Sequence, residues 1–251
     1  MDDLIPEIPV LANIILLTAY FYADQLIGML NQQKPDIKTA VFEHPKQILS
    51  LPPVTLAQSR LISFGSRFYV GDGLLRKFGF GAYNFHPGPS HYPGWAPFNF
   101  ALYDGATEYG VTVHEMTNTI DAGDIIALRN FSMSGIDTVQ RLMDITTHNM
   151  YVLFNELAPR LVLNEKPEKL NDAEWSGTLG TKRLFRKMCQ LTLEIEKEEL
   201  DRRMSAFGDG DGAQLPFIIH NNQFYEMATG NEPADHQSLI LHGYRFILRR
   251  Y

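Results

Sequence analysis

The chain has 251 residues, of which 45% are hydrophobic and 20% are charged, the ordinary composition of a globular protein. Its formal net charge of −7 argues against a general nucleic-acid binder, which needs a broad basic face. A single cysteine excludes an internal disulfide bond and favours a reducing compartment. The apolar stretch 8–20 is too short to span a bilayer and follows acidic residues, so neither a membrane segment nor a secretory signal is expected, and a cytoplasmic protein is predicted.

The first two thirds of the chain alternate between strand-like and helix-like segments. Residues 12–18 form a continuous apolar run typical of a buried central strand, and residues 22–33 follow with helical spacing. The proline-containing stretch 43–59 is expected to be irregular. Further strands are expected at 37–42, 61–64, the stretch ending at His86, 109–115 and 124–131. Further helices are expected at 72–78, at 97–104, and from a capping box at Asp137 to about Leu163. This alternation predicts an α/β fold with a doubly wound, mostly parallel sheet.

The pattern changes after Pro167 and the polar run 171–175. We therefore predict a main domain over residues 1–168 and a small C-terminal α+β domain over residues 169–251. In the second domain, residues 181–207 read as one charged amphipathic helix. Short strands are expected at 215–220, 223–227 and 239–248, forming a β-hairpin or a barrel-like sheet.

One stretch concentrates residues suited to catalysis. Asn84 and His86 lie two residues apart at the end of a predicted strand, so their side chains point to the same side of the sheet. Pro87 and Pro89 then force the chain into a loop. Asp121 follows 35 residues after His86. Each residue alone is more often structural, but sites of doubly wound sheets lie outside the carboxyl ends of the strands, which favours one shared site.

The order of these motifs resembles that of the folate-dependent formyltransferase family. The matching segments are Asn84-Phe-His86, Pro93-Gly94, Gly110-Val-Thr112 and Asp121-Ala-Gly123-Asp124. The family includes the methionyl-tRNA, glycinamide ribonucleotide and nucleotide-sugar N-formyltransferases, and the chain is most similar in type to the sugar enzymes. The resemblance implies a Rossmann-like fold and the transfer of a formyl group from 10-formyltetrahydrofolate to a primary amine, without a metal.

The resemblance also implies a role for each residue of the trio. Asn84 would donate a hydrogen bond to the tetrahedral oxyanion, and His86 would stabilise the same oxygen or relay the amine proton. Asp121 would orient His86 and raise its pKa. The family's Ser-Leu-Leu-Pro segment after the histidine is replaced here by the segment 88–93, Gly-Pro-Ser-His-Tyr-Pro, which bears on the identity of the substrate.

Binding residues follow from the same resemblance. The pterin is expected between the loop after the third strand and the backbone around the aspartate, at Phe68, Tyr69, Val70, Asn118, Thr119, Ile120 and Gly123. Aromatic residues after His86 are expected to stack on the substrate, at His91, Tyr92 and Trp95. The alternative is that these aromatic side chains only pack the loops. His114 is expected to be a structural residue of its strand.

The acidic chain and its aromatic loop favour a nucleotide-linked amino sugar as the formyl acceptor. Initiator methionyl-tRNA is the alternative, but it predicts a basic track, and a basic cluster is evident only between Lys182 and Lys187. An amino acid bound to a carrier protein, a formate-releasing hydrolase and a non-catalytic folate-binding or interaction protein stay open. A homodimer and a substrate contact by Asp124 or by the basic cluster also stay open.

Overall fold

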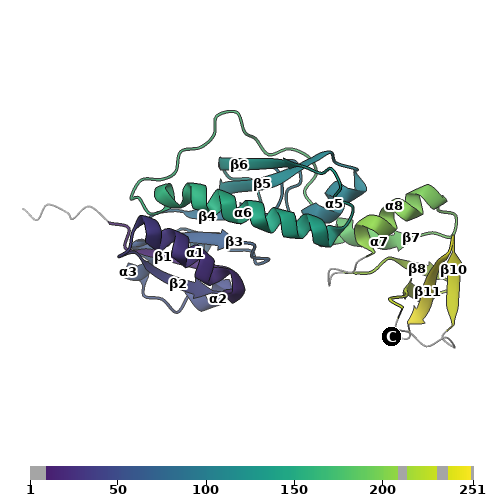
Figure 1. Ribbon diagram of the computed structural model, residues 1–251. Helices are drawn as coiled ribbons and strands as arrows, with labels where there is room; N and C mark the ends of the chain where they lie inside the picture. The colour runs from purple at the N-terminus through teal and green to yellow at the C-terminus, as the bar shows by residue number, and fades with distance from the viewer. Residues whose placement is uncertain (1–9, 209–213, 231–236, 250–251) are drawn as a thin grey trace, which may run out of the picture. The chain divides into compact units, whose positions relative to one another are not determined.

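The computed structural model describes residues 10–208, 214–230 and 237–249 (Figure 1). The chain forms two compact units that each combine several segments. Among the described residues, the first unit comprises 10–93, 110–131 and 145–177, and the second comprises 94–109, 132–144 and those from 178 onward. The predicted boundary at residue 168 stays a prediction. No helix among the described residues is long and apolar enough to cross a membrane.

The main sheet has six strands in the order β2-β1-β3-β4-β5-β6. Their bounds are β1 Asn13–Leu17, β2 Lys38–Phe42, β3 Ser59–Phe64, β4 Ala82–His86, β5 Glu108–Glu115 and β6 Ile125–Ser132. Strands β1 to β4 pair parallel with one another, and β5 runs antiparallel to β4. The predicted mostly parallel α/β sheet is confirmed.

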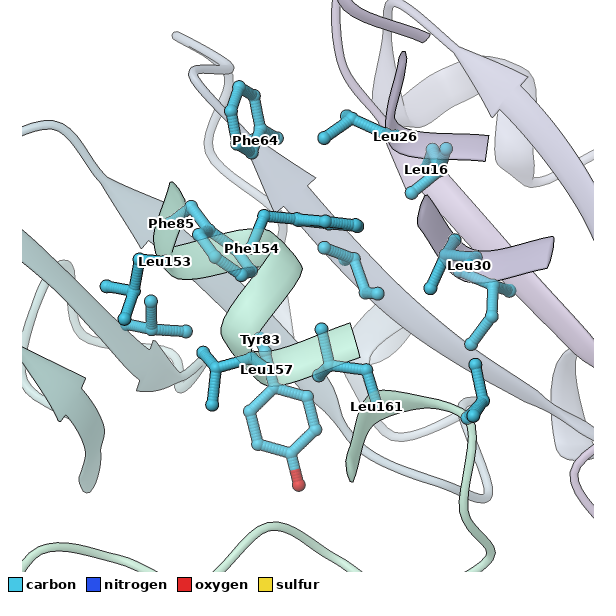
Figure 2. Packing of buried hydrophobic residues seen from close by; sticks show 14 of the residues in the cluster. Leu16, Leu26, Leu30, Phe64, Tyr83, Phe85, Leu153, Phe154, Leu157 and Leu161 are labelled. Atoms are coloured by element: carbon cyan, nitrogen blue, oxygen red, sulfur yellow. The ribbon is translucent and has the colours of Figure 1, made fainter. Parts of the chain in front are cut away.

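Both faces of this sheet are buried because alternate residues of each strand point to opposite sides. On one face, Leu16 of β1 packs with side chains of α1 (Tyr20–Gln33) and of α6 (Val139–Leu161), as Figure 2 shows. Phe85 of β4 lies 5.1 Å from Phe154 of α6, centroid to centroid. On the other face, Leu17 belongs to a second apolar cluster with residues of α2 (Pro45–Ile48), α3 (Pro53–Ala57) and α4 (Asp72–Leu75).

Two local predictions for the first part of the chain were wrong. The stretch 43–59 holds the short helices α2 and α3, because Pro45 and Pro53 each stand at the start of a helix, where a missing N–H costs nothing. The side chain that caps α6 is that of Thr138, whose hydroxyl oxygen accepts from the backbone N–H of Arg141 at 3.2 Å, and not that of Asp137.

A buried arginine joins β3 to the end of α6. Arg60 is fully buried, and all its described hydrogen bonds go to backbone carbonyl oxygens. Its guanidinium donates to Phe80 at 2.9 Å, to Leu161 at 2.6 Å and to Glu165 at 2.8 Å. Burial lowers the pKa of this guanidinium. Arg60 therefore satisfies carbonyl groups that the last turn of a helix leaves without partners.

The second unit contains α5 (Pro97–Tyr103), α7 (Lys182–Cys189) and α8 (Lys197–Phe207) and a sheet in the order β10-β11-β9-β8-β7. These strands are β7 Gln190–Leu191, β8 Phe217–His220, β9 Gln223–Met227, β10 Ser238–Leu241 and β11 Tyr244–Arg249. The single helix predicted over 181–207 was wrong, because Leu191 is buried and pairs with Ile218 as a strand. The predicted strand 239–248 is a hairpin that turns at His242 and Gly243, both with positive φ.

Candidate active site

The candidate site is built on the carboxyl end of β4. Tyr83 and Phe85 point into the apolar core, so the alternation of the strand places Asn84 and His86 on the opposite face. His86 is 3% exposed, and Asn84 is half-buried. β5 lies antiparallel to β4 with His114 directly across from Asn84. The sheet therefore brings an amide and two imidazoles together.

Asp121 reaches the same place from the turn between β5 and β6. Its φ of 44° lies in the left-handed region, which aspartate tolerates better than most residues and which is common at functional sites. Gly123 has no room for a side chain, since a Cβ atom there would lie 1.8 Å from the carbonyl oxygen of Glu115. The glycine thus allows the turn to press against the end of β5 and to direct Asp121 inward.

The carboxylate of Asp121 bridges the two histidines. Its Oδ2 lies 3.3 Å from His86 Nδ1, and its Oδ1 lies 3.2 Å from His114 Nε2. Asn84 Nδ2 lies 3.2 Å from the same His114 nitrogen. The predicted contact between His86 and Asp121 is confirmed. His114, expected only to support its strand, contacts both Asn84 and Asp121, and its position opposite Asn84 was not apparent without the register of β4 and β5.

The outer nitrogens of the two rings face backbone carbonyl oxygens. His86 Nε2 lies 3.0 Å from the oxygen of Tyr92, and His114 Nδ1 lies 2.9 Å from that of Glu115. Because a carbonyl oxygen only accepts, each of these nitrogens donates its N–H in the present arrangement. A neutral His86 carries one ring N–H but faces two acceptors, the carbonyl oxygen of Tyr92 and the carboxylate of Asp121. If that hydrogen moves to Nδ1 and faces Asp121, Nε2 becomes a base.

The charge state expected for His86 has to be corrected. Burial lowers its pKa, the carboxylate of Asp121 acts in the opposite direction, and the nearby His114 lowers it further. Asp121 raises the pKa of His86 as expected, but burial outweighs it, so the net pKa is lowered and not raised. Desolvation outweighs the ion pair because the ring is almost entirely withdrawn from water. A neutral imidazole can accept a proton, which suits a general base.

Trp175 covers the two histidines and was not found from the sequence. Its ring meets His86 edge-on at 5.7 Å and His114 at 5.0 Å between centroids. Its indole N–H donates to the carbonyl oxygen of Gly123 at 2.8 Å. The next residue, Ser176, donates its N–H to Ser90 in the loop after β4 at 3.0 Å. The only sequence signal was a lone tryptophan within a polar run that was interpreted as a domain boundary.

The residues predicted to bind the pterin lie on two segments of the first unit that are joined by a hydrogen bond. The hydroxyl of Tyr69 donates to the carbonyl oxygen of Asn118 at 3.0 Å. Phe68, Tyr69 and Ile120 are exposed, as are Asn118 and Thr119. Val70, in contrast, is buried in the apolar cluster beneath the sheet, so its side chain is not available to a ligand.

The aromatic residues predicted to face the substrate do not all belong to the same compact unit. His91 and Tyr92 belong to the first unit, with ring centroids 5.0 Å apart, and the backbone oxygen of Tyr92 is the one that accepts from His86. Trp95 belongs to the second unit, where it packs against an apolar cluster and the ammonium group of Lys182 lies 4.8 Å from its ring. Among the described residues, no group of three or more histidine, cysteine, aspartate or glutamate side chains could hold a metal ion.

Residues 66–156 match the family described as formyl transferase. They include Asn84, His86 and Asp121. The matched residues contain the loop after β3, the strand β4 with Asn84 and His86, and the turn with Asp121.

Solved structures of two formyltransferases and of HypX share the fold of the chain. It is similar to a sugar N-formyltransferase from Shewanella sp FDAARGOS_354, with 16% identity and a TM-score of 0.66, over 89% of this chain and 98% of that one. It is similar to methionyl-tRNA formyltransferase from Clostridium thermocellum, with 13% identity and a TM-score of 0.60, over 94% and 97%. HypX from Aquifex aeolicus in complex with tetrahydrofolic acid matches 94% of this chain with 43% of its own, at 16% identity and a TM-score of 0.57.

Proposed function

We propose that the chain transfers a formyl group from 10-formyltetrahydrofolate to the primary amine of a nucleotide-linked amino sugar. The observation that carries this proposal is the contact of His86 with Asp121, beside Asn84, at the end of β4 in a stretch that matches the formyl transferase family. The complete trio argues against a non-catalytic folate-binding protein, because a protein that only binds folate has no need of a buried imidazole–carboxylate pair.

The chemistry assigns one step to each side chain. The neutral amine attacks the formyl carbon, which forms a new C–N bond and places negative charge on the formyl oxygen. The amide of Asn84 donates a hydrogen bond to that oxyanion, a contribution commonly worth about 10²–10³ in rate. His86 Nε2 takes the proton that the amine loses and returns it to the leaving nitrogen as the old C–N bond breaks. Asp121 faces Nδ1 and holds the ring in the tautomer that leaves Nε2 free.

The folate fits the exposed side chains of Phe68, Tyr69 and Ile120. Large apolar side chains that remain exposed beside a candidate site are typical of a ligand-binding surface. The hydrogen bond from Tyr69 to Asn118 ties these two segments together, so the surface they form is held in place on both sides. Phe68 is further supported by the ring of His44, 4.4 Å away between centroids.

Methionyl-tRNA is the second candidate acceptor because of one observation in the second unit. Helix α7 carries four exposed cationic side chains, Lys182, Arg183, Arg186 and Lys187, which form no ion pair within the described part of the chain. Such a cluster suits a phosphate backbone. It is short for a tRNA track in a chain with a net charge of −7, so we place the amino sugar first.

One assay separates these functions. The protein is incubated with 10-formyltetrahydrofolate, alone or with nucleoside diphosphate-linked 2-, 3- or 4-amino sugars or with methionyl-tRNA, and tetrahydrofolate is measured. Release that requires an amino sugar supports the proposal, and release that requires methionyl-tRNA with a steep salt dependence selects the second candidate. Release without any amine identifies a hydrolase. No release under any condition overturns the proposed transfer.

A further inference from the structure

A cavity of about 420 Å³ lies beside the candidate site in the first unit. It is lined by the turn after Asp121, residues 122–125, and by the segment 169–175, including Trp175. Its volume falls within the usual range of small-molecule sites, about 300–1,000 Å³. Gly123 is the one lining residue that is also expected to contact the pterin, and none of the lining side chains transfers a proton in the proposed reaction, so the cavity is available for another ligand group.

The walls of this cavity are tied together at both ends. The backbone N–H of Leu170 donates to the carbonyl oxygen of Ile125 at 2.7 Å, and the indole of Trp175 donates to that of Gly123 at 2.8 Å. Gly123 is in turn held against Glu115 from the other side, where no Cβ atom would fit. Hydrogen bonds thus fix the separation of the two segments, which gives a hollow of defined width.

The wall chemistry is that of a site for a hydroxylated ring. Trp175 is half-buried and offers an aromatic surface, while Asp124, Asn171, Glu174 and Lys169 bring carboxylate, amide and ammonium groups to the same hollow. Sugar hydroxyl groups both donate and accept, so planar carboxylates and amides pair with them, and the C–H face of the ring packs on an indole. Two carboxylates and one ammonium leave an excess negative charge, which disfavours phosphate and attracts a cationic amine.

The residues that line the cavity contact or adjoin the residues of the proposed active site. Trp175, which lines the cavity, contacts His86 and His114, and Ala122 directly follows Asp121. We propose that this cavity is the subsite for the hydroxylated ring of the formyl acceptor, with Trp175 as its aromatic surface and with Asp124 and Asn171 as its hydroxyl partners. This inference rests on the proposed function and adds the place where the sugar part of the acceptor is held.

Two tryptophans make the binding step measurable. The chain contains only Trp95 and Trp175, so the variants W95F and W175F each leave one fluorescent indole. The titrant is the amino-sugar nucleotide that supports transfer or, if none does, UDP-glucosamine. Saturable quenching is expected in the wild type and in W95F, and its loss is expected in W175F. Quenching that persists in W175F and disappears in W95F would overturn the assignment of this cavity.

Kinetics of cavity variants test the same subsite without changing Trp175. In N171A and D124N, KM for the acceptor is expected to rise at least about tenfold, the value of one lost good hydrogen bond to a ligand, with kcat within about twofold of wild type. Matched controls are N31A and D36N, exposed residues of the first unit outside the cavity, and both are expected to keep the wild-type KM.

The outcomes separate failure of the subsite from failure of the proposed function. If the wild type transfers formyl groups to an amino sugar but N171A and D124N keep its KM, the subsite is wrong and the function stands. If UDP-glucosamine quenches Trp175 and no amine is ever formylated, the cavity binds such rings and the function is wrong. A fall in kcat with unchanged KM and unchanged quenching also counts against the subsite.

Discussion

Replacing Gly123 by alanine tests whether the turn that carries Asp121 is part of the catalytic apparatus. An alanine Cβ atom would lie 1.8 Å from the carbonyl oxygen of Glu115, whereas real Cβ contacts essentially never fall below 3.0 Å. The obstacle is backbone on β5, which cannot rotate away as a flexible side chain would. The turn must therefore move by about 1 Å, and a misplacement of that size can cost about 10² in rate.

We therefore expect kcat of Gly123→Ala to fall by about 10² per folded molecule. The assay is release of tetrahydrofolate at saturating donor and acceptor, with the folded fraction measured by circular dichroism. The shift of the turn also loosens the hydrogen bond from Trp175 to Gly123, so the fluorescence of Trp175 should change in the same variant. The effect is expected in kcat because Asp121 acts through His86 in the chemical step.

The matched control is Gly73→Ala in helix α4. A Cβ atom at Gly73 meets nothing within 4 Å, and alanine favours helix, so activity should stay within about twofold of wild type and stability should rise slightly. Wild-type kcat in a folded Gly123→Ala protein would refute the claim that this turn positions the site. Equal losses in both variants would point to a general sensitivity of the fold.

Three further results are expected. His86→Ala and Asn84→Ala should each lower kcat at least about 10² with an unchanged circular dichroism spectrum, and near-normal turnover in either would contradict the assigned roles. The rate should fall at low pH as His86 gains a proton. Because burial lowers the pKa of His86, the midpoint of the pH–rate profile should lie below the ordinary histidine value of about 6.5. Trp175→Ala exposes the ring to water and should move this midpoint upward. Arg60→Met should lower the free energy of unfolding in urea by about 3 kcal/mol or more, since it leaves buried carbonyl groups without donors. The value of kcat per folded molecule should stay unchanged, and a clear fall in it would place Arg60 in the site.

The local features of the sheet could be predicted because they depend on short-range patterns. Period-two alternation and continuous apolar runs identified β1, β2 and β4, and the alternation alone placed Asn84 and His86 on one face. The contact of His86 with Asp121 followed from a family pattern of spacing. The short helices α2 and α3 were missed because their prolines were interpreted as breakers, although proline favours the first turn of a helix.

The remaining parts of the site depend on long-range packing. His114 joins Asn84 only because β4 and β5 pair antiparallel in one register, and a shift of one residue would turn it to the other face. Trp175 reaches the histidines because its segment returns to the sheet after α6, which no local pattern encodes. The effect of Asp121 on the pKa of His86 was expected, but the larger and opposite effect of burial was missed, since burial is a property of the folded chain.

Arg60 has a consequence for the segment that carries Trp175. The positive charge of the Arg60 guanidinium is balanced by the partial negative charge of the carbonyl groups at the end of α6. If that end of the helix frayed, the guanidinium would be buried without hydrogen-bond acceptors. The last turn of α6 should therefore exchange its amide hydrogens only when the whole first unit opens. The segment after this turn therefore starts from a fixed position. The starting point from which Trp175 extends to its hydrogen bond with Gly123 should be the same in every molecule.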